Sequence, residues 1–107
     1  MPGTAKRLSG PSQITNAAVT KYTVGAGLRG IIRHIHVLNP SGAIVNFTAS
    51  IGADAAGTRI YDATPIPANS AVDFFCFHVL NAAEILQALG STTLVLVLTV
   101  NGEEEVV

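Results

Sequence analysis

Two short motifs hold the residues of this sequence that are best suited to bind a metal ion. His34 and His36 form a His-x-His pair, and Cys76 and His78 form a Cys-x-His pair. In a β-strand, residues two apart project from the same face, so each pair can present two ligands side by side. Imidazole and thiolate are ligands that Zn²⁺ prefers. A zinc site built from His34, His36, Cys76 and His78 is therefore one hypothesis, and it requires the two strands to be neighbours.

A half-buried strand face explains the same two pairs without any ion. On that interpretation the histidines and the cysteine alternate with apolar neighbours such as Leu38 and Phe74. We therefore predict that the protein has no metal site and no cofactor, and keep the four-ligand set as the alternative.

Catalytic patterns are also weak. Nucleophilic catalysis needs a Ser or Cys, a His and an orienting acid in one pocket, and no nucleophile-elbow motif is present. Cys76 lies among Phe74, Phe75 and Phe77, where a cysteine usually behaves as a small hydrophobic residue. The Gly25–Gly30 segment matches G-x-G-x-x-G, but it leads into a strand-like run, whereas a dinucleotide site needs a helix there. We predict that the protein is not an enzyme and has no catalytic residues.

Charge is divided along the sequence. Residues 1–53 carry five basic residues and no acidic one, whereas residues 54–107 carry Arg59 and seven acidic residues, for a net charge of −1. Opposite charges can pair within one subunit or between copies. The basic residues are scattered, with Tyr22 the only aromatic among them, so we expect no nucleic-acid partner. The candidate interface residues are Lys6, Arg7, Arg33, His34, His36, Glu103, Glu104 and Glu105.

Composition favours burial against partners. Charged residues make up 12% of the chain and hydrophobic residues 49%, where an ordinary domain has about 25% charged residues. So little charge covers a surface poorly, which favours a homo-oligomer, with a trimer as one option. The longest strongly apolar stretch, Leu94 to Val100, is too short to cross a bilayer as a helix, and we expect no membrane partner.

The elements that position these residues are predicted to be strands. Alternating or β-branched runs occur at residues 19–24, 28–38, 45–51, 58–63 and 72–80, separated by Gly, Pro and Asn turns. In the second run, Ile31, Ile35 and Val37 are expected to face inward, with His34, His36 and Leu38 on the other face. In the last run, we expect Phe75, Phe77 and Val79 to form the core row.

The remaining segments complete the expected fold. Residues 1–17 are rich in Gly, Pro, Ser and Thr and are predicted to form an extended N-terminal arm, followed by a single domain over residues 18–107. Residues 82–89 are the only segment that could be helical. Residues 94–100 are apolar on both faces, as in a central strand. The fold class is all-β, an antiparallel β-sandwich or jelly-roll-like barrel.

Several of these turn and core segments resemble a group of small virion proteins from tailed bacteriophages. The resemblance covers residues 22–101 and rests on residues 21–27, 31–39, 59–62 and 65–70. The sequence departs from the group's turn chemistry at Gly25, where Pro is expected, and at Asn69, where Gly is expected. Both remain good turn residues.

The resemblance implies a non-enzymatic virion component that is assembled in the host cytoplasm. A capsid decoration (cement) protein that binds the major capsid protein or other virion proteins is the expected function, favoured by chain length, the arm and the low surface charge. A tail- or fibre-associated protein is an alternative, and a glycan- or receptor-binding β-sandwich module is another. The absence of Trp weakens the glycan alternative, since sugar sites usually display exposed aromatic side chains.

Overall fold

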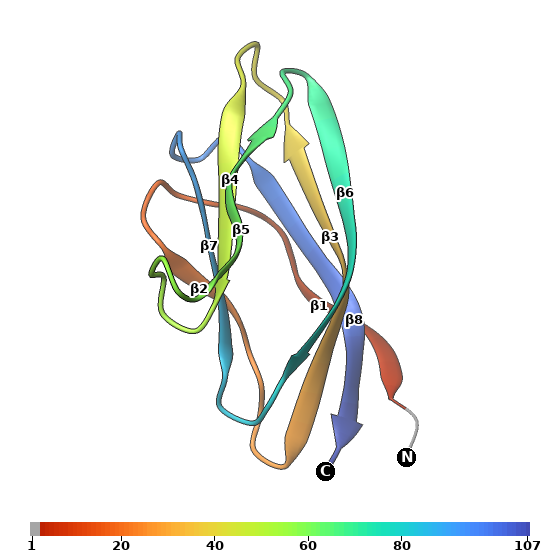
Figure 1. Cartoon of the computed structure of the whole chain (residues 1–107). Coiled ribbons are helices and arrows are strands. Elements are labelled where there is room, and N and C mark those ends of the chain that lie inside the picture. Colours follow the sequence, from red (N-terminus) through yellow and green to blue (C-terminus); the bar gives the residue numbers. More distant parts are fainter. Residues whose placement is uncertain (1–2) are drawn as a thin grey trace.

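The computed structural model of the chain describes residues 3–107, which form β-strands joined by turns and loops (Figure 1). No helix occurs in this range, and so none that could span a membrane. The strands are β1 (Thr4–Gln13), β2 (Val19–Thr23), β3 (Leu28–Asn39), β4 (Val45–Ile51), β5 (Arg59–Ile66), β6 (Ser70–Leu80), β7 (Ile85–Gly90) and β8 (Val97–Val106).

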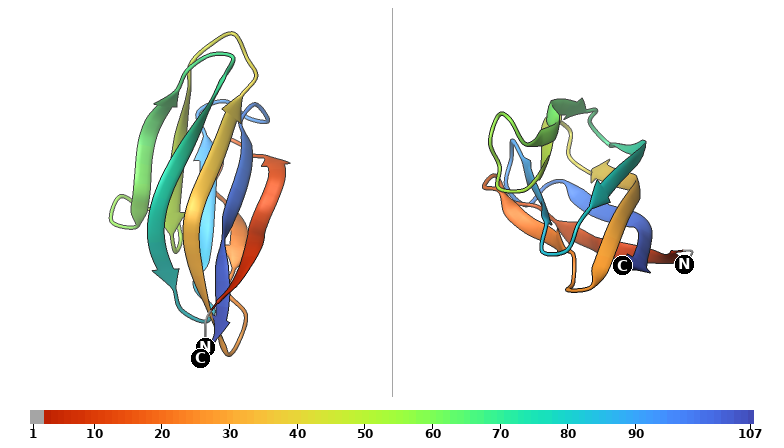
Figure 2. Two further views of the ribbon diagram at one scale, coloured as in Figure 1. Left: turned by 90° about the vertical axis from the view of Figure 1, so that its right-hand side faces the viewer. Right: turned by 60° about the horizontal axis from the view of Figure 1, so that its bottom comes forward.

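The strands form two four-stranded antiparallel sheets that pack face to face. Sheet A has the order β1-β8-β3-β6, and sheet B has the order β2-β7-β4-β5. The left view of Figure 2 shows sheet A face on, with the C-terminus beside the start of β1. The expected antiparallel β-sandwich is therefore confirmed.

One hydrophobic core fills the space between the sheets. Strand β3 alternates as expected, with Ile35 and Val37 pointing inward, and Val45, Phe47 and Ala49 of β4 point inward as well. Further core residues come from the start of β3, from other strands and from the loops beside them: Ile14, Tyr22, Val24, Ile32, Ile66, Leu80, Leu86, Ala88, Leu96, Leu98 and Val100. Each large apolar side chain buried in this way stabilises the fold by about 1.5–3 kcal/mol.

The extended N-terminal arm expected over residues 1–17 is not confirmed. Met1 and Pro2 lie outside the described residues, but Thr4–Gln13 forms β1, an edge strand of sheet A that pairs with β8. The pairing is interrupted between Ser9 and Ser12, where Pro11 has no backbone N–H to donate. The Gly, Pro and Ser content therefore reflects an irregular edge strand.

The possible helix over residues 82–89 is also wrong. Asn81–Glu84 forms a turn, and Ile85–Gly90 forms β7 between β2 and β4. Leu86 and Ala88 point into the core, whereas Gln87 lies on the opposite face. The tertiary position between two strands overrides the helical propensity of these residues.

Strand β8 is central in sheet A, as residues 94–100 were expected to be, but it begins and ends later. Leu94 adopts a positive φ of 56° in the preceding turn and is exposed. The strand then runs on through Glu103, Glu104 and Glu105 to Val106. The acidic segment is thus a paired strand end.

A bulge in β3 changes which isoleucines face the core. The pairing of β3 shifts between Ile32 and His34 on both sides. Relative to β8, Arg33 is an additional residue, whereas relative to β6 the additional residue lies on β6, where Cys76 and Phe77 stand opposite Arg33 alone. As a result Ile32 belongs to the core, together with Ile35. Ile31 was expected on the inner face together with Ile35, and this prediction is wrong. Its side chain is buried but does not belong to the core cluster between the sheets.

Candidate functional site

The outer face of sheet A, the side directed away from the core, carries an exposed apolar row on β6. The side chains of Phe75, Phe77 and Val79 are 81%, 59% and 42% exposed. The expectation that these three residues form the core row of β6 is therefore wrong. The inward row is its neighbour in sequence, which includes Phe74, Cys76 and Leu80.

Packing with sheet B explains why Phe74 faces inward. Its ring lies 4.5 Å from the Tyr61 ring and 5.9 Å from the Phe47 ring, measured between centroids. Both rows of β6 are apolar, so alternation alone gives no preference for either face. The aromatic partners on β4 and β5 decide the orientation.

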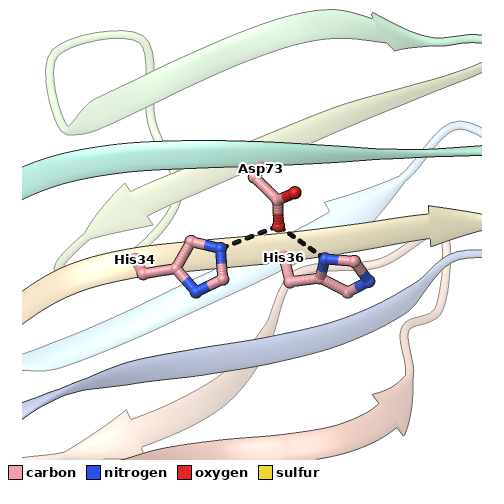
Figure 3. Close-up of side chains that lie close together, drawn as sticks. All are labelled: His34, His36 and Asp73. Carbon is pink, nitrogen blue, oxygen red and sulfur yellow. Dashed lines mark hydrogen bonds and ion pairs between the residues drawn. The ribbon is translucent and has the colours of Figure 1, made fainter.

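Next to the exposed row, two histidines and an aspartate converge (Figure 3). The β3 bulge places His34 and His36 on the outer face, and the register puts Asp73 of β6 opposite His36. Asp73 Oδ1 lies 2.7 Å from His34 Nε2 and 2.6 Å from His36 Nδ1. These three residues form the His34–His36–Asp73 cluster.

The cluster is held by neighbouring side chains. His34 Nδ1 lies 3.1 Å from the Asn101 side-chain nitrogen, and the His34 ring stacks on Phe75 at 4.8 Å between centroids. The hydrogen bonds from His36 and His34 lower the pKa of Asp73 below its usual value. The carboxylate therefore stays ionised to a lower pH than an ordinary aspartate does.

The four-ligand alternative is not assembled. His34 and His36 lie on the outer face of sheet A, whereas Cys76 and His78 lie on the inward row of β6. The Cys76 thiol is 3.8 Å from the Ile32 carbonyl oxygen, and burial raises its pKa. One face of a strand cannot share a ligand shell with the other face.

Arg33, at the bulge, connects the cluster to the charged end of the sheet. Its Nε donates to Glu103 Oε1 at 2.7 Å, and its guanidinium lies 5.0 Å from the centre of the Phe77 ring. A cation over an aromatic face is attracted by the ring electrons. Arg33 therefore covers part of the exposed row from within the same subunit.

Most of the other charged interface candidates also pair within one chain. Lys6 Nζ and Glu104 Oε1 are 2.7 Å apart, as are Arg29 Nη1 and Glu105 Oε1. The three glutamates of β8 thus each have a cation from β1 or β3. Among residues 3–107, Arg7 is in no ion pair.

Tyr22 ties this charged end to sheet B. Its ring lies over Gly30, where a Cβ atom would come within 2.5 Å of the tyrosine hydroxyl. The hydroxyl donates to Glu104 Oε2 at 2.7 Å. The hydrogen bonds from Lys6 and Tyr22 lower the pKa of Glu104, and burial is the main cause of a raised pKa at Tyr22.

Two participants of the outer face, Asp73 and Asn101, were not singled out from the sequence, and the exposed phenylalanines Phe75 and Phe77 were expected in the core. Asp73 is the one acidic residue of β6 and lies on the same row as Phe75 and Phe77. An acid on an expected core row was the available indication that this row faces outward. Asn101 is adjacent to His34 only through the register of β3 with β8.

No model of a known protein family matches the sequence, and comparison with curated proteins found no similar one.

Proposed function

We propose that the protein is a non-enzymatic structural component of a tailed-bacteriophage virion, and that it decorates the capsid as a homo-oligomer. The virion role rests on the resemblance of the turn and core segments. The observation that carries the assembly role is the exposed row of Phe75, Phe77 and Val79 on an edge strand. Large exposed apolar patches on a soluble domain usually mark interaction surfaces.

The edge of β6 lacks the protection found on the other edge strands. Free edges are usually blocked by charges, proline, irregular pairing or short length. β1 carries Lys6, Arg7 and Pro11 with interrupted pairing, and β5 carries Arg59 and Pro65. β2 has only 5 residues. β6 has 11 residues without Lys, Arg or Pro, and its ladder partner is β3 alone.

A second copy of the chain is the occupant that fits this edge best. In an antiparallel pair related by a two-fold axis, β6 of each copy would supply the same edge and the same aromatic row. The backbone groups on the free edge would gain partners, and the phenylalanines of both copies would lie on one continuous outer face. Asp73, the only charge on β6, is already bonded to His34 and His36 and presents little obstacle.

The contact also suits the low charge of the chain. The three β8 glutamates are paired inside the subunit, so an interface on β6 need not bury unpaired charges. Because the backbone of the sandwich is already ordered, the conformational entropy lost on assembly comes mainly from side chains at the interface.

The mass of the protein in solution tests the self-association. The natural chain should sediment as an oligomer, and the double variant Phe75→Ser, Phe77→Ser should be a monomer that remains folded by circular dichroism. Ile44→Ser is the matched control, because Ile44 is 66% exposed but lies in the loop between β3 and β4. A natural chain that stays monomeric at high concentration would contradict the assembly role.

The virion role needs a separate test. Electron microscopy of particles produced by a phage genome that encodes this chain should show density for it at repeated capsid positions. Particles that lack the protein, or that carry it only on the tail, would contradict capsid decoration.

Glycan binding is a second candidate, favoured by one observation. Exposed Phe75 stacks on His34 beside Asp73, and an aromatic face next to polar groups is the arrangement that sugar-binding sites share. Specific binding on a glycan array, lost in Phe75→Ser, would favour this function over self-assembly.

A further inference from the structure

We propose that His34, His36 and Asp73 form a binding site for one divalent transition-metal ion of the zinc class on the outer face of sheet A. The proposal is independent of the virion role. It rests on the convergence of two imidazoles and one carboxylate from neighbouring strands, within 4.8 Å of one another.

The distances suit a metal ion of this size. In a tetrahedral site with bonds of about 2.0–2.2 Å, ligand atoms lie roughly 3.3–3.5 Å apart. The two imidazole nitrogens lie 2.7 and 2.6 Å from the same oxygen of Asp73. An ion would therefore lengthen each of these nitrogen–oxygen distances by roughly 0.6–0.9 Å, which rotation of the partly exposed Asp73 side chain can supply.

The ligand types select the class of ion. Two nitrogen ligands favour Zn²⁺, Ni²⁺, Co²⁺ or Cu²⁺, whereas Mg²⁺ and Ca²⁺ require oxygen ligands. Three protein ligands leave at least one coordination position to water or to a group from outside the chain. The site is open enough to admit such a group, since the side chains of His34, His36 and Asp73 all remain partly exposed.

Asn101 supplies the support that a metal-bound histidine needs. Metal-binding histidines usually donate the N–H of their other ring nitrogen to a neighbouring acceptor. Nδ1 is the other nitrogen of His34, and it lies 3.1 Å from the Asn101 side-chain amide. If the amide turns over, its oxygen accepts the Nδ1 proton while Nε2 binds the ion. Stacking on Phe75 fixes the orientation of the His34 ring.

The inference can be tested by calorimetric titration of the full chain with Zn²⁺. The protein must carry no polyhistidine tag, because such a tag would itself bind the ion. One ion per chain should bind, and Mg²⁺ should give no heat of binding. His34→Ala, His36→Ala and Asp73→Asn should each weaken Zn²⁺ binding by tenfold or more, and Asn101→Leu by about tenfold. His78→Gln is the matched control, because His78 lies on the inward row of β6, and it should bind as the natural chain does.

Two outcomes would overturn the site. The first is the absence of saturable binding of one Zn²⁺ per chain, which would leave the cluster as a hydrogen-bonded network only. The second is binding that the three variants do not change although their melting temperatures show that they are folded. Nitrogen NMR of the histidine side chains gives a readout that needs no variant: on adding Zn²⁺, His34 Nε2 and His36 Nδ1 should shift, and both nitrogens of His78 should not.

Discussion

At the scale of single residues, Glu104 stands out at the charged end of sheet A, because its carboxylate bonds to two different strands. Its two carboxylate oxygens accept separate hydrogen bonds, one from Lys6 of β1 and one from Tyr22 of β2. These contacts join sheet A to sheet B across a side chain that is only 15% exposed. Glu104 therefore links residues far apart in the sequence through charge-assisted bonds, which are stronger than neutral ones.

This arrangement makes stability depend on pH. The pKa of Glu104 is lowered from 4.5 by Lys6 and Tyr22, so its contribution is complete above that value and is lost as the pH falls through the lowered folded pKa. Glu104→Gln should reduce the free energy of unfolding by about 1 kcal/mol at neutral pH. The difference from the natural chain should shrink as the pH falls toward about 3.

Urea unfolding at both pH values measures this effect. Asp62→Asn serves as a control for removal of a carboxylate, because the Asp62 side chain is 65% exposed, and it should change stability little at either pH. An equal loss for Glu104→Gln at both pH values would show that the charge of Glu104 contributes nothing.

At the scale of elements, the bulge between Ile32 and His34 decides what sheet A presents on each side. It brings Ile32 into the core and leaves His34 and His36 on the outer face beside Asp73. Gly102 of β8 pairs with Ile32 at this bulge. A Cβ atom at position 102 would overlap the backbone carbonyl oxygen of Ile31, so only glycine fits there without a shift of the strands.

Gly102→Ala should therefore destabilise the sandwich through overpacking, by about 1–3 kcal/mol. For a domain of this size the melting temperature should fall by roughly 5–20 °C. Gly42→Ala is the matched control, because a Cβ atom there meets nothing within 4 Å. Thermal unfolding followed by circular dichroism compares the two variants, and equal melting temperatures would show that β3 and β8 can separate without cost.

At the scale of the whole molecule, the division of charge along the sequence becomes a set of contacts inside one subunit. β8 lies between β1 and β3, so its three glutamates meet Lys6, Arg29 and Arg33 of the same chain. These pairs leave few unpaired charges near the termini for a neighbouring copy. The apolar row on β6 is the stronger basis for the self-association that we propose.

Salt dependence of the oligomer separates the two mechanisms. Electrostatic screening shortens the range of charge interactions from about 10 Å at 0.1 M salt to about 3 Å at 1 M, whereas apolar burial is not weakened by it. The mass measured in solution should therefore be the same at both salt concentrations. Dissociation at high salt alone would indicate that ion pairs between subunits hold the oligomer.

Local sequence pattern is enough to predict the all-β class, the position of most strands and the inward rows of β3 after the bulge and of β4. In these segments apolar and polar residues alternate, and alternation with a period of two is a local property that the chain carries into any fold. The pairing of His34 with His36 on one face was predictable for the same reason.

The remaining features depend on tertiary contacts. Both faces of β6 are largely apolar. Which of them is exposed depends on the packing of Phe74 against Phe47 and Tyr61 of sheet B. Residues 4–13 and 85–90 become strands because β8, β2 and β4 offer them hydrogen-bond partners. Asp73 and Asn101 reach His34 through register alone. Each of these outcomes depends on contacts between residues distant in sequence, which a local pattern does not encode.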